Sequence, residues 1–281
     1  MHLWYTEHDI NHRVLNAVAA GLSRTSIPVQ AMQSEGAQSI PEGEHICYGV
    51  LRGSDAVLKT SERLGWPWYH IDNGYLRPGH FHGYYRISKG NTQVHFTPSQ
   101  AADGERWHSL ALKIAPWQRN HFGHVLLCPP TAAVGAFFGF DAKRWLSDVL
   151  ATLARCSLRP VVVRHKGASR PLEEDLQGAY AVVTFNSGVA WQALIQGIPA
   201  IADWRCVVRS WNGFDFADIE MDLTQSDRQA LFYCLANNQF TLQEIAERPD
   251  LWVTALRNQS TWPAVWRIEP SAIVEPNRAT P

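Results

Sequence analysis

The regular alternation of short apolar runs with amphipathic segments constrains the fold of this chain more than any other feature. In the second half, apolar runs end at prolines, glycines or polar residues, and segments with helical spacing lie between them. Strands that alternate with helices at this spacing predict βαβ units and a parallel sheet. The runs that we interpret as strands are residues 124–130, 159–167, 180–188 and 198–203.

The first half follows the same pattern. Strands are expected at residues 2–7, 26–32, 45–51 and 66–72, and helices at 11–22, ending near Gly21, and at 53–65, between Ser54 or Asp55 and Gly65. Residues 89–120 are less regular and are expected to form a loop and a short helix. The predicted fold class is therefore α/β, with two Rossmann-like domains, residues 1–120 and 121–281, facing each other across a cleft.

The composition limits the possible functions. A formal net charge of −1 provides no global field for nucleic acid or an anionic membrane, so any anion site must be local. The five cysteines are widely spaced and form no CxxC pair, which argues against a disulfide framework and a zinc knuckle. The first residues do not resemble a signal peptide, and no apolar run is long enough for a membrane span, so we expect a cytoplasmic protein.

The strongest local pattern is VVTFNSGVAWQALIQGIPAIAD, residues 182–203, where an apolar strand ends at Asn186, Ser187 and Gly188 and a helix begins at once. The first N–H groups of such a helix favour a phosphate at the ligand crevice of a doubly wound sheet. The alternative is that Asn186 or Ser187 only caps the helix. Arg164 and Lys166, at the end of the neighbouring predicted strand, would supply positive charge, unless they are a solvated surface pair.

The segment YHIDNGYLRPGHFHGYYRIS, residues 69–88, is either a binding loop or an aromatic strand pair in the core. Asp72, at the end of a predicted strand, could act as a general base on a hydroxyl group or could orient a histidine that does so. His80 and His82 are the alternatives, because the pKa of an unperturbed imidazole is near working pH. His70 could join them around a metal, but no further ligand spacing supports this, and no metal is expected.

Several common catalytic motifs are missing from the sequence. It contains no GxGxxG followed by an acid, no GxxxxGK[ST], no HExxH and no GxSxG. Nicotinamide-dependent, P-loop, zincin and serine-hydrolase activities therefore lack the residues that they need. No tightly bound cofactor is expected either.

Three segments together resemble the capsule-polysaccharide family of GT-B glycosyltransferases, the Kdo-transferring enzymes. The segment Asp72-Asn73-Gly74-Tyr75-Leu76-Arg77 is similar to a family segment of the form E-D-G-[FY]-x-R, and Arg164-His165-Lys166 loosely resembles a K-x-H-P segment. A third family block is matched at Thr184, Ser187, Ala193, Leu194, Gly197 and Pro199. The resemblance covers residues 45–90 and 120–215. The family has Glu where this chain has Gln192, which puts contacts to the donor ribose or sugar in doubt. The combination of YGVLRG, YHIDNGY and GYYRIS also resembles uncharacterised phage-type proteins, some of which are linked to DNA base modification.

The resemblance implies a metal-independent glycosyltransferase that uses a nucleotide-sugar as co-substrate. The donor phosphate would bind on the second domain at Arg164, Lys166, Asn186, Ser187, Gly188 and Gln192. The acceptor would approach from the first domain, contacting Tyr75, Arg77, Tyr84 and Arg86, with Asp72, His80 or His82 as the base.

The acceptor is expected to be a polyanion. Residues 76–124 contain six Lys or Arg (Arg77, Arg86, Lys89, Arg106, Lys113, Arg119) against two acids. Such a basic and aromatic segment suits hydroxymethylated phage DNA or an anionic surface polysaccharide, unless these residues scatter over the surface. Two other functions remain open: a sugar-nucleotide epimerase of the same fold, and a non-catalytic module that binds nucleic acid or glycan.

Overall fold

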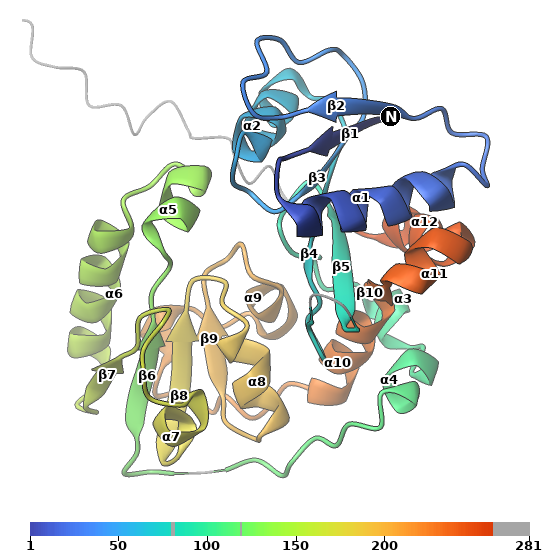
Figure 1. Cartoon of the computed structure of the whole chain (residues 1–281). Helices are drawn as coiled ribbons and strands as arrows, with labels where there is room; N and C mark the ends of the chain where they lie inside the picture. Colours follow the sequence, from blue (N-terminus) through green and yellow to red (C-terminus); the bar gives the residue numbers. More distant parts are fainter. Residues whose placement is uncertain (80–81, 119, 261–281) are drawn as a thin grey trace, which may run out of the picture.

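The chain folds into two separate β-sheets connected by helices (Figure 1). The structure is a computed structural model that describes residues 1–79, 82–118 and 120–260. The first sheet has six strands in the order β10-β5-β4-β3-β1-β2, of which β1 to β4 run parallel and β5 and β10 antiparallel to their neighbours. Its strands are β1 (His2–Tyr5), β2 (Gln30–Gln33), β3 (His45–Tyr48), β4 (Trp68–Asn73), β5 (Tyr84–Lys89) and β10 (Gln239–Thr241).

The second sheet has four strands, all parallel, in the order β7-β6-β8-β9. They are β6 (His124–Cys128), β7 (Val161–Val163), β8 (Ala179–Thr184) and β9 (Ala200–Ala202). Each of these short apolar runs is followed by a helix or turn, as the sequence alternation predicts. The predicted fold class, α/β with two Rossmann-like domains across a cleft, is confirmed.

Alternate side chains of the first sheet supply two different cores. Leu3, Ile46 and Ile71 face the helices α1 (Asp9–Leu22), α11 (Leu242–Glu247) and α12 (Pro249–Asn258). Their neighbours Trp4 and Cys47 face the opposite side, where α2 (Ser54–Leu64) and α5 (Ala132–Phe138) pack. Because α5 follows β6 of the second sheet, this second core joins the two domains.

The second sheet is also covered on both faces. Val125 and Val183 pack against α6 (Ala142–Cys156). The other face, with Leu126 and Val182, belongs to a core that continues into the first domain through Tyr75. The helices that pack around Leu126 and Val182 are α3 (Pro98–Ala101), α4 (Glu105–Ser109), α7 (Leu172–Leu176), α8 (Val189–Ile195), α9 (Val207–Asn212) and α10 (Arg228–Asn237). The short 3-10 helix η1 (Phe216–Asp218) lies beside α6.

The end of the described chain returns to the first domain. β10 pairs with β5, with Phe240 opposite Tyr85, and α11 and α12 then pack beside α1, as Figure 1 shows. Residues 239–258 complete the first sheet and its helical layer, so they belong with the first domain and not with the second, to which the predicted division at residue 120 assigns them. For the chain before residue 239, the domain boundary near residue 120 stays a prediction.

Gly21 lies at the end of α1, as predicted, and it also makes a close contact that the sequence did not indicate. It is the next-to-last residue of α1, which ends at Leu22. A Cβ atom at this position would lie 2.2 Å from the carbonyl oxygen of Ile245. The glycine is needed because α11 approaches the backbone of α1 closely at this point, a contact between segments far apart in the sequence.

Among the described helices, none is both long enough and apolar enough to cross a membrane.

We predict that the contact of α5 with the first domain is a major source of stability. The Phe137 side chain is 2% exposed and packs in the cluster with Trp4 and Cys47. Replacing it with Ala should lower the free energy of unfolding by about 3–5 kcal/mol, because it removes a buried aromatic ring and leaves a cavity. Urea unfolding measures the loss.

Phe122, which is 98% exposed, provides the matched control. Its replacement by Ala should change the stability by less than about 0.5 kcal/mol, and equal losses in both variants would contradict the packing argument.

Candidate functional site

A cavity of about 620 Å³ lies between the two sheets. It is lined by the residues that end or directly follow four parallel strands, β4, β6, β7 and β8. Ligands of open α/β sheets bind at the carboxyl ends of the strands, so this is the place where a Rossmann-like pair of domains is expected to hold a ligand. The four lining segments are residues 72–75, 128–131, 164–167 and 186–188.

Asp72 projects into the cavity from the end of β4 and is paired with Arg86. The two residues lie opposite each other on β4 and β5, and Arg86 Nη2 donates to Asp72 Oδ2 over 2.9 Å. The Asp72 side chain is 35% exposed. Burial raises the pKa of this carboxyl group, but Arg86, His70, the Asn73 N–H and Lys166 together hold the pKa below its ordinary value. Asp72 is therefore a carboxylate at neutral pH.

Arg86 itself is fully engaged. Besides Asp72, it donates from Nη1 to the Asn73 carbonyl over 2.7 Å and from Nε to the Thr92 carbonyl over 3.1 Å. Its guanidinium also lies over the Tyr75 ring, 5.3 Å from the ring centre. Arg86 lines the cavity, but these contacts make it a support for Asp72 more than a free cation for an acceptor.

Tyr75 lines the cavity as part of the protein core. It is 2% exposed, and its hydroxyl accepts the Val94 N–H over 2.8 Å. The ring meets Trp191 of α8 edge to face at 5.2 Å, which connects the two domains. Burial raises the pKa of its hydroxyl, so Tyr75 stays neutral.

The other residues predicted on the acceptor side do not line this cavity. Arg77 and His82 are exposed in the loop before β5, and Tyr84 is half-buried against the core that contains Leu126 and Val182. His80 lies outside the described residues. Of the predicted bases, Asp72 is thus the one that the described structure places in the cavity.

The predicted phosphate segment meets the cavity at the start of α8. Asn186, Ser187 and Gly188 all line it. The Ser187 hydroxyl accepts the Val189 N–H over 3.3 Å, so part of the capping interpretation also holds. The Asn186 carbonyl accepts from Gln93 Nε2 over 2.7 Å, which fixes this turn to the segment after β5. Gln192, one turn further along α8, is exposed and lines the cavity as well.

The two cations after β7 have different surroundings. Arg164 bonds to the buried carboxylate of Asp175, which it shares with Arg170. Burial raises the pKa of Asp175, but the two guanidinium groups hold it below its ordinary value. Lys166, in contrast, is exposed and takes part in none of the ion pairs found among the described residues. It is close enough to Asp72 to help lower the pKa of that carboxyl group.

The basic segment of residues 76–124 does not form one basic surface in the described chain. Arg86 is paired with Asp72, and Arg106 donates to the Glu244 carboxylate over 2.8 Å and 3.1 Å while its guanidinium lies over the Phe240 ring. Arg119 lies outside the described residues. Two of the six cations are thus committed to internal ion pairs.

Sequence reasoning missed the place of two features in the cavity, one of them His70, which it considered only as a possible metal ligand. His70 lies two residues before Asp72 on β4 and lines the cavity, a position that the strand periodicity could have indicated. The second feature is α5. Thr131 caps it by accepting the Val134 N–H over 3.3 Å, and the residues around this cap form one wall of the cavity. The sequence pattern gave no helix at this point, because α5 has only seven residues.

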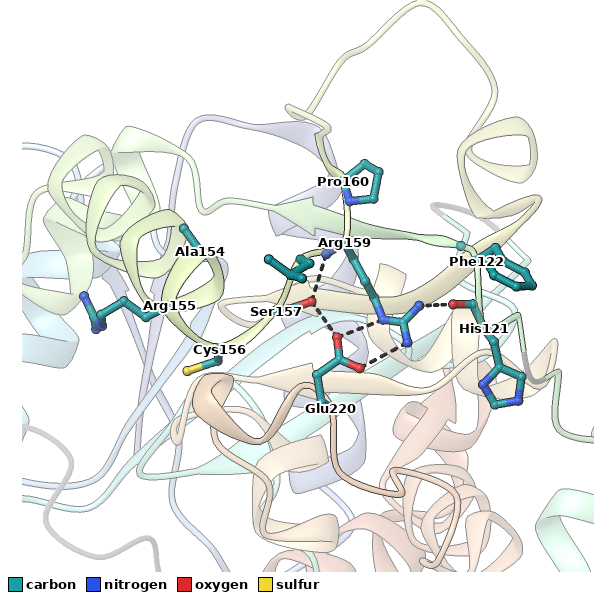
Figure 2. A pocket seen from close by; sticks show the side chains of 11 residues that line it. His121, Phe122, Ala154, Arg155, Cys156, Ser157, Arg159, Pro160 and Glu220 are labelled. Atoms are coloured by element: carbon teal, nitrogen blue, oxygen red, sulfur yellow. Dashed lines mark hydrogen bonds and ion pairs between the residues drawn. The ribbon is translucent and has the colours of Figure 1, made fainter.

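A second hollow, also of about 620 Å³, lies at the opposite end of the second sheet. Figure 2 shows Arg159 at its centre, with the guanidinium held by the Glu220 carboxylate and by the His121 carbonyl. Residues 121–123 and 157–160 directly precede β6 and β7, so this hollow opens at the amino ends of the strands. Rossmann-like sheets bind their ligands at the other end.

Comparison with family models gave no match, and neither did comparison with the sequences of curated proteins. Several solved structures are similar in fold, among them two KpsC transferases. One is Thermosulfurimonas dismutans KpsC, beta Kdo 2,4 transferase, with a TM-score of 0.46 and 12% identity over 83% of this chain and 89% of that one. The other is Thermosulfurimonas dismutans KpsC, beta Kdo 2,7 transferase, with a TM-score of 0.47 and 10% identity over 90% of this chain and 99% of that one.

We predict that the protein loses stability as the pH falls from 7 towards 4. The pKa of His70 is lowered to about 4 chiefly by burial, and the pKa of His45 is lowered to about 4 by burial together with the nearby His2 and N-terminus. An unfolded chain binds these protons near pH 6.5, so acidification favours unfolding until the folded pKa is reached. For His70 alone this amounts to about 3 kcal/mol. Urea unfolding at pH 7, 6 and 5 measures the effect.

The His70→Leu variant tests this assignment. It should show a smaller loss of unfolding free energy between pH 7 and pH 5 than the wild type, because one of the two buried histidines is gone. An equal loss in both proteins would contradict the assignment.

Proposed function

We propose that the protein is a glycosyltransferase that moves a sugar from a nucleotide-sugar to a hydroxyl group of an acceptor in the interdomain cavity. One observation carries the proposal: the Asp72 carboxylate of the first domain and the Lys166 ammonium of the second line the same cavity, beside the turn at Asn186–Gly188. Sugar transfer needs a base for the acceptor proton and positive charge for the leaving phosphate. The cavity offers both.

The donor side is assigned to the second domain. Lys166 supplies a charge that forms no ion pair with a described carboxylate, and the turn before α8 adds backbone polar groups. Arg164 contributes less directly, since its charge is shared with Asp175. Cations and backbone N–H groups can stabilise a leaving phosphate without a metal ion.

The acceptor side is assigned to the first domain. The acceptor hydroxyl attacks the anomeric carbon while Asp72 takes up its proton, and the bond from that carbon to the phosphate oxygen breaks. The leaving phosphate keeps the electron pair and faces Lys166. The pair with Arg86 keeps Asp72 ionised and oriented for this step, although the same pair makes it a weaker base.

Two observations favour this proposal over the other functions. An epimerase of this fold would need acids close to the sugar, but among the described residues that line the cavity Asp72 is the sole carboxylate. A module for nucleic acid would need a basic surface, and Arg86 and Arg106 of the basic segment are instead held in internal ion pairs. We therefore propose a glycan acceptor, and hydroxymethylpyrimidine DNA is the comparison acceptor in the test.

The test is a transfer assay with uridine, guanosine, thymidine and cytidine nucleotide-sugars. Each donor is offered with anionic oligosaccharides, with hydroxymethylpyrimidine DNA and without an acceptor. Sugar transfer to oligosaccharide supports the proposal, and transfer to DNA alone would replace the glycan with DNA as acceptor. Epimerised donor without transfer, or binding without turnover, would contradict it.

We predict that Asp72→Asn lowers kcat by about a hundredfold or more, because the amide cannot accept the acceptor proton. The dissociation constant of the donor should stay within about twofold, because Asp72 is on the acceptor side. Asp148→Asn is the control, since the Asp148 side chain is 71% exposed on α6 and away from the cavity. Full activity of Asp72→Asn would remove the base assignment.

We predict that Lys166→Ala and Arg164→Ala have different effects. Lys166→Ala should weaken donor binding about tenfold without lowering the melting temperature, because it removes an exposed charge. Arg164→Ala should lower the free energy of unfolding by about 3 kcal/mol, because the buried Asp175 loses one of its two partners. Calorimetric titration and urea unfolding measure these effects. Lys143→Ala, on the exposed face of α6, is the control, and unchanged donor binding in Lys166→Ala would exclude this residue from the site.

A further inference from the structure

The floor of the cavity contains a histidine whose ring has no hydrogen-bond partner. His70 is 1% exposed and lines the cavity from β4, on the same strand face as Asp72. Alternate residues of a strand lie about 7 Å apart, so the two side chains are neighbours. Neither Nδ1 nor Nε2 of His70 forms a hydrogen bond with any described residue.

The neighbouring side chains are unable to satisfy the ring because they are used elsewhere. Cys47 and Ser88 lie beside His70 on β3 and β5. The Cys47 thiol points to the Ser54 carbonyl at 4.0 Å, and the Ser88 hydroxyl donates to the Asn91 carbonyl over 2.6 Å. The Thr92 carbonyl is near enough to raise the pKa of the ring slightly, but it forms no hydrogen bond with it and already accepts from Arg86.

A buried polar group without a partner is unfavourable, and most such groups in proteins are satisfied by protein, water or ligand. His45 is the other buried histidine of this sheet. One of its two ring nitrogens has a partner, because Nδ1 accepts from Trp4 Nε1 over 2.9 Å. His70 differs from it in facing the cavity. A neutral imidazole offers one donor and one acceptor, and a hydroxyl group can match either of them.

We infer that His70 binds a hydroxyl group of a sugar at the floor of the cavity, beside the carboxylate of Asp72. The nitrogens are covered in the free protein, so the ring turns towards the cavity as the sugar enters. One sugar ring carries several hydroxyl groups and can contact His70 and Asp72 together. The identification of this sugar as the acceptor rests on the proposed function, whereas the binding of a sugar hydroxyl does not.

Nuclear magnetic resonance of the full chain with 15N-labelled histidine tests this inference. The probes are a mixture of methyl glycosides of common hexoses and, separately, the nucleoside diphosphates UDP and GDP. The ring resonances of His70, assigned by their loss in His70→Leu, should shift with the glycosides and saturate. They should not shift with the diphosphates, and the resonances of His45 should respond to neither.

Each outcome decides the question. A shift of the His70 resonances with the glycosides supports the inference, even if the wild type transfers no sugar, in which case the proposed transfer reaction alone is wrong. No response to the glycosides, or a response to the diphosphates alone, would overturn it.

The variants provide a second measurement once an acceptor is found. His70→Leu should raise the KM for the acceptor about tenfold and leave the donor dissociation constant unchanged, while melting no lower than the wild type at pH 7. His70→Gln, which keeps a donor and an acceptor, should recover part of the loss. If His70→Leu folds poorly, the comparison of His70→Gln with the wild type still tests the inference. An acceptor KM that is unchanged in both variants would show that His70 is an ordinary core residue.

Discussion

The ion pair between Asp72 and Arg86 organises the cavity. Three nitrogen atoms of one guanidinium group bind the Asp72 carboxylate, the Asn73 carbonyl and the Thr92 carbonyl. These bonds tie the end of β4 to the segment that follows β5. The guanidinium also lies over Tyr75, which packs against Trp191 of the second domain. The position of the carboxylate therefore depends on the same contacts that join the domains, and the charge of Arg86 keeps it ionised.

The cavity is bounded on two sides by packed protein. On one side, Phe137 and Phe138 of α5 pack against the first domain. On the other, Gln93 joins the domains through its side-chain amide, which donates to the Asn186 carbonyl over 2.7 Å and accepts the Val207 N–H over 3.1 Å. Such contacts hold the lining residues at fixed separations. A preorganised site of this kind lowers the free-energy cost of placing two reactants side by side.

Sequence patterns predicted those parts of the fold that depend on local periodicity. The parallel strands and the turn at Asn186–Gly188 were expected, because apolar runs and strand-to-helix turns can be recognised within a few residues. The roles of Arg164 and Lys166 could not be separated in this way, since the partner of Arg164 is Asp175, on another element. The close contact of Gly21 with Ile245 could not be predicted for the same reason. Contacts across long sequence separations decide both cases, and no local pattern encodes them.

The return of the chain to the first sheet has a consequence for synthesis in the cell. A ribosome releases the first domain early, but at that stage β5 is an open edge and one helical layer of the sheet is incomplete. Residues 239–258 provide the missing strand and the helices that cover Ile71 and Ile87. Until these residues emerge, an edge strand and a strip of apolar surface stay exposed, both of which promote aggregation. The nascent first domain therefore depends on protection of this edge and surface until residues 239–258 have been made.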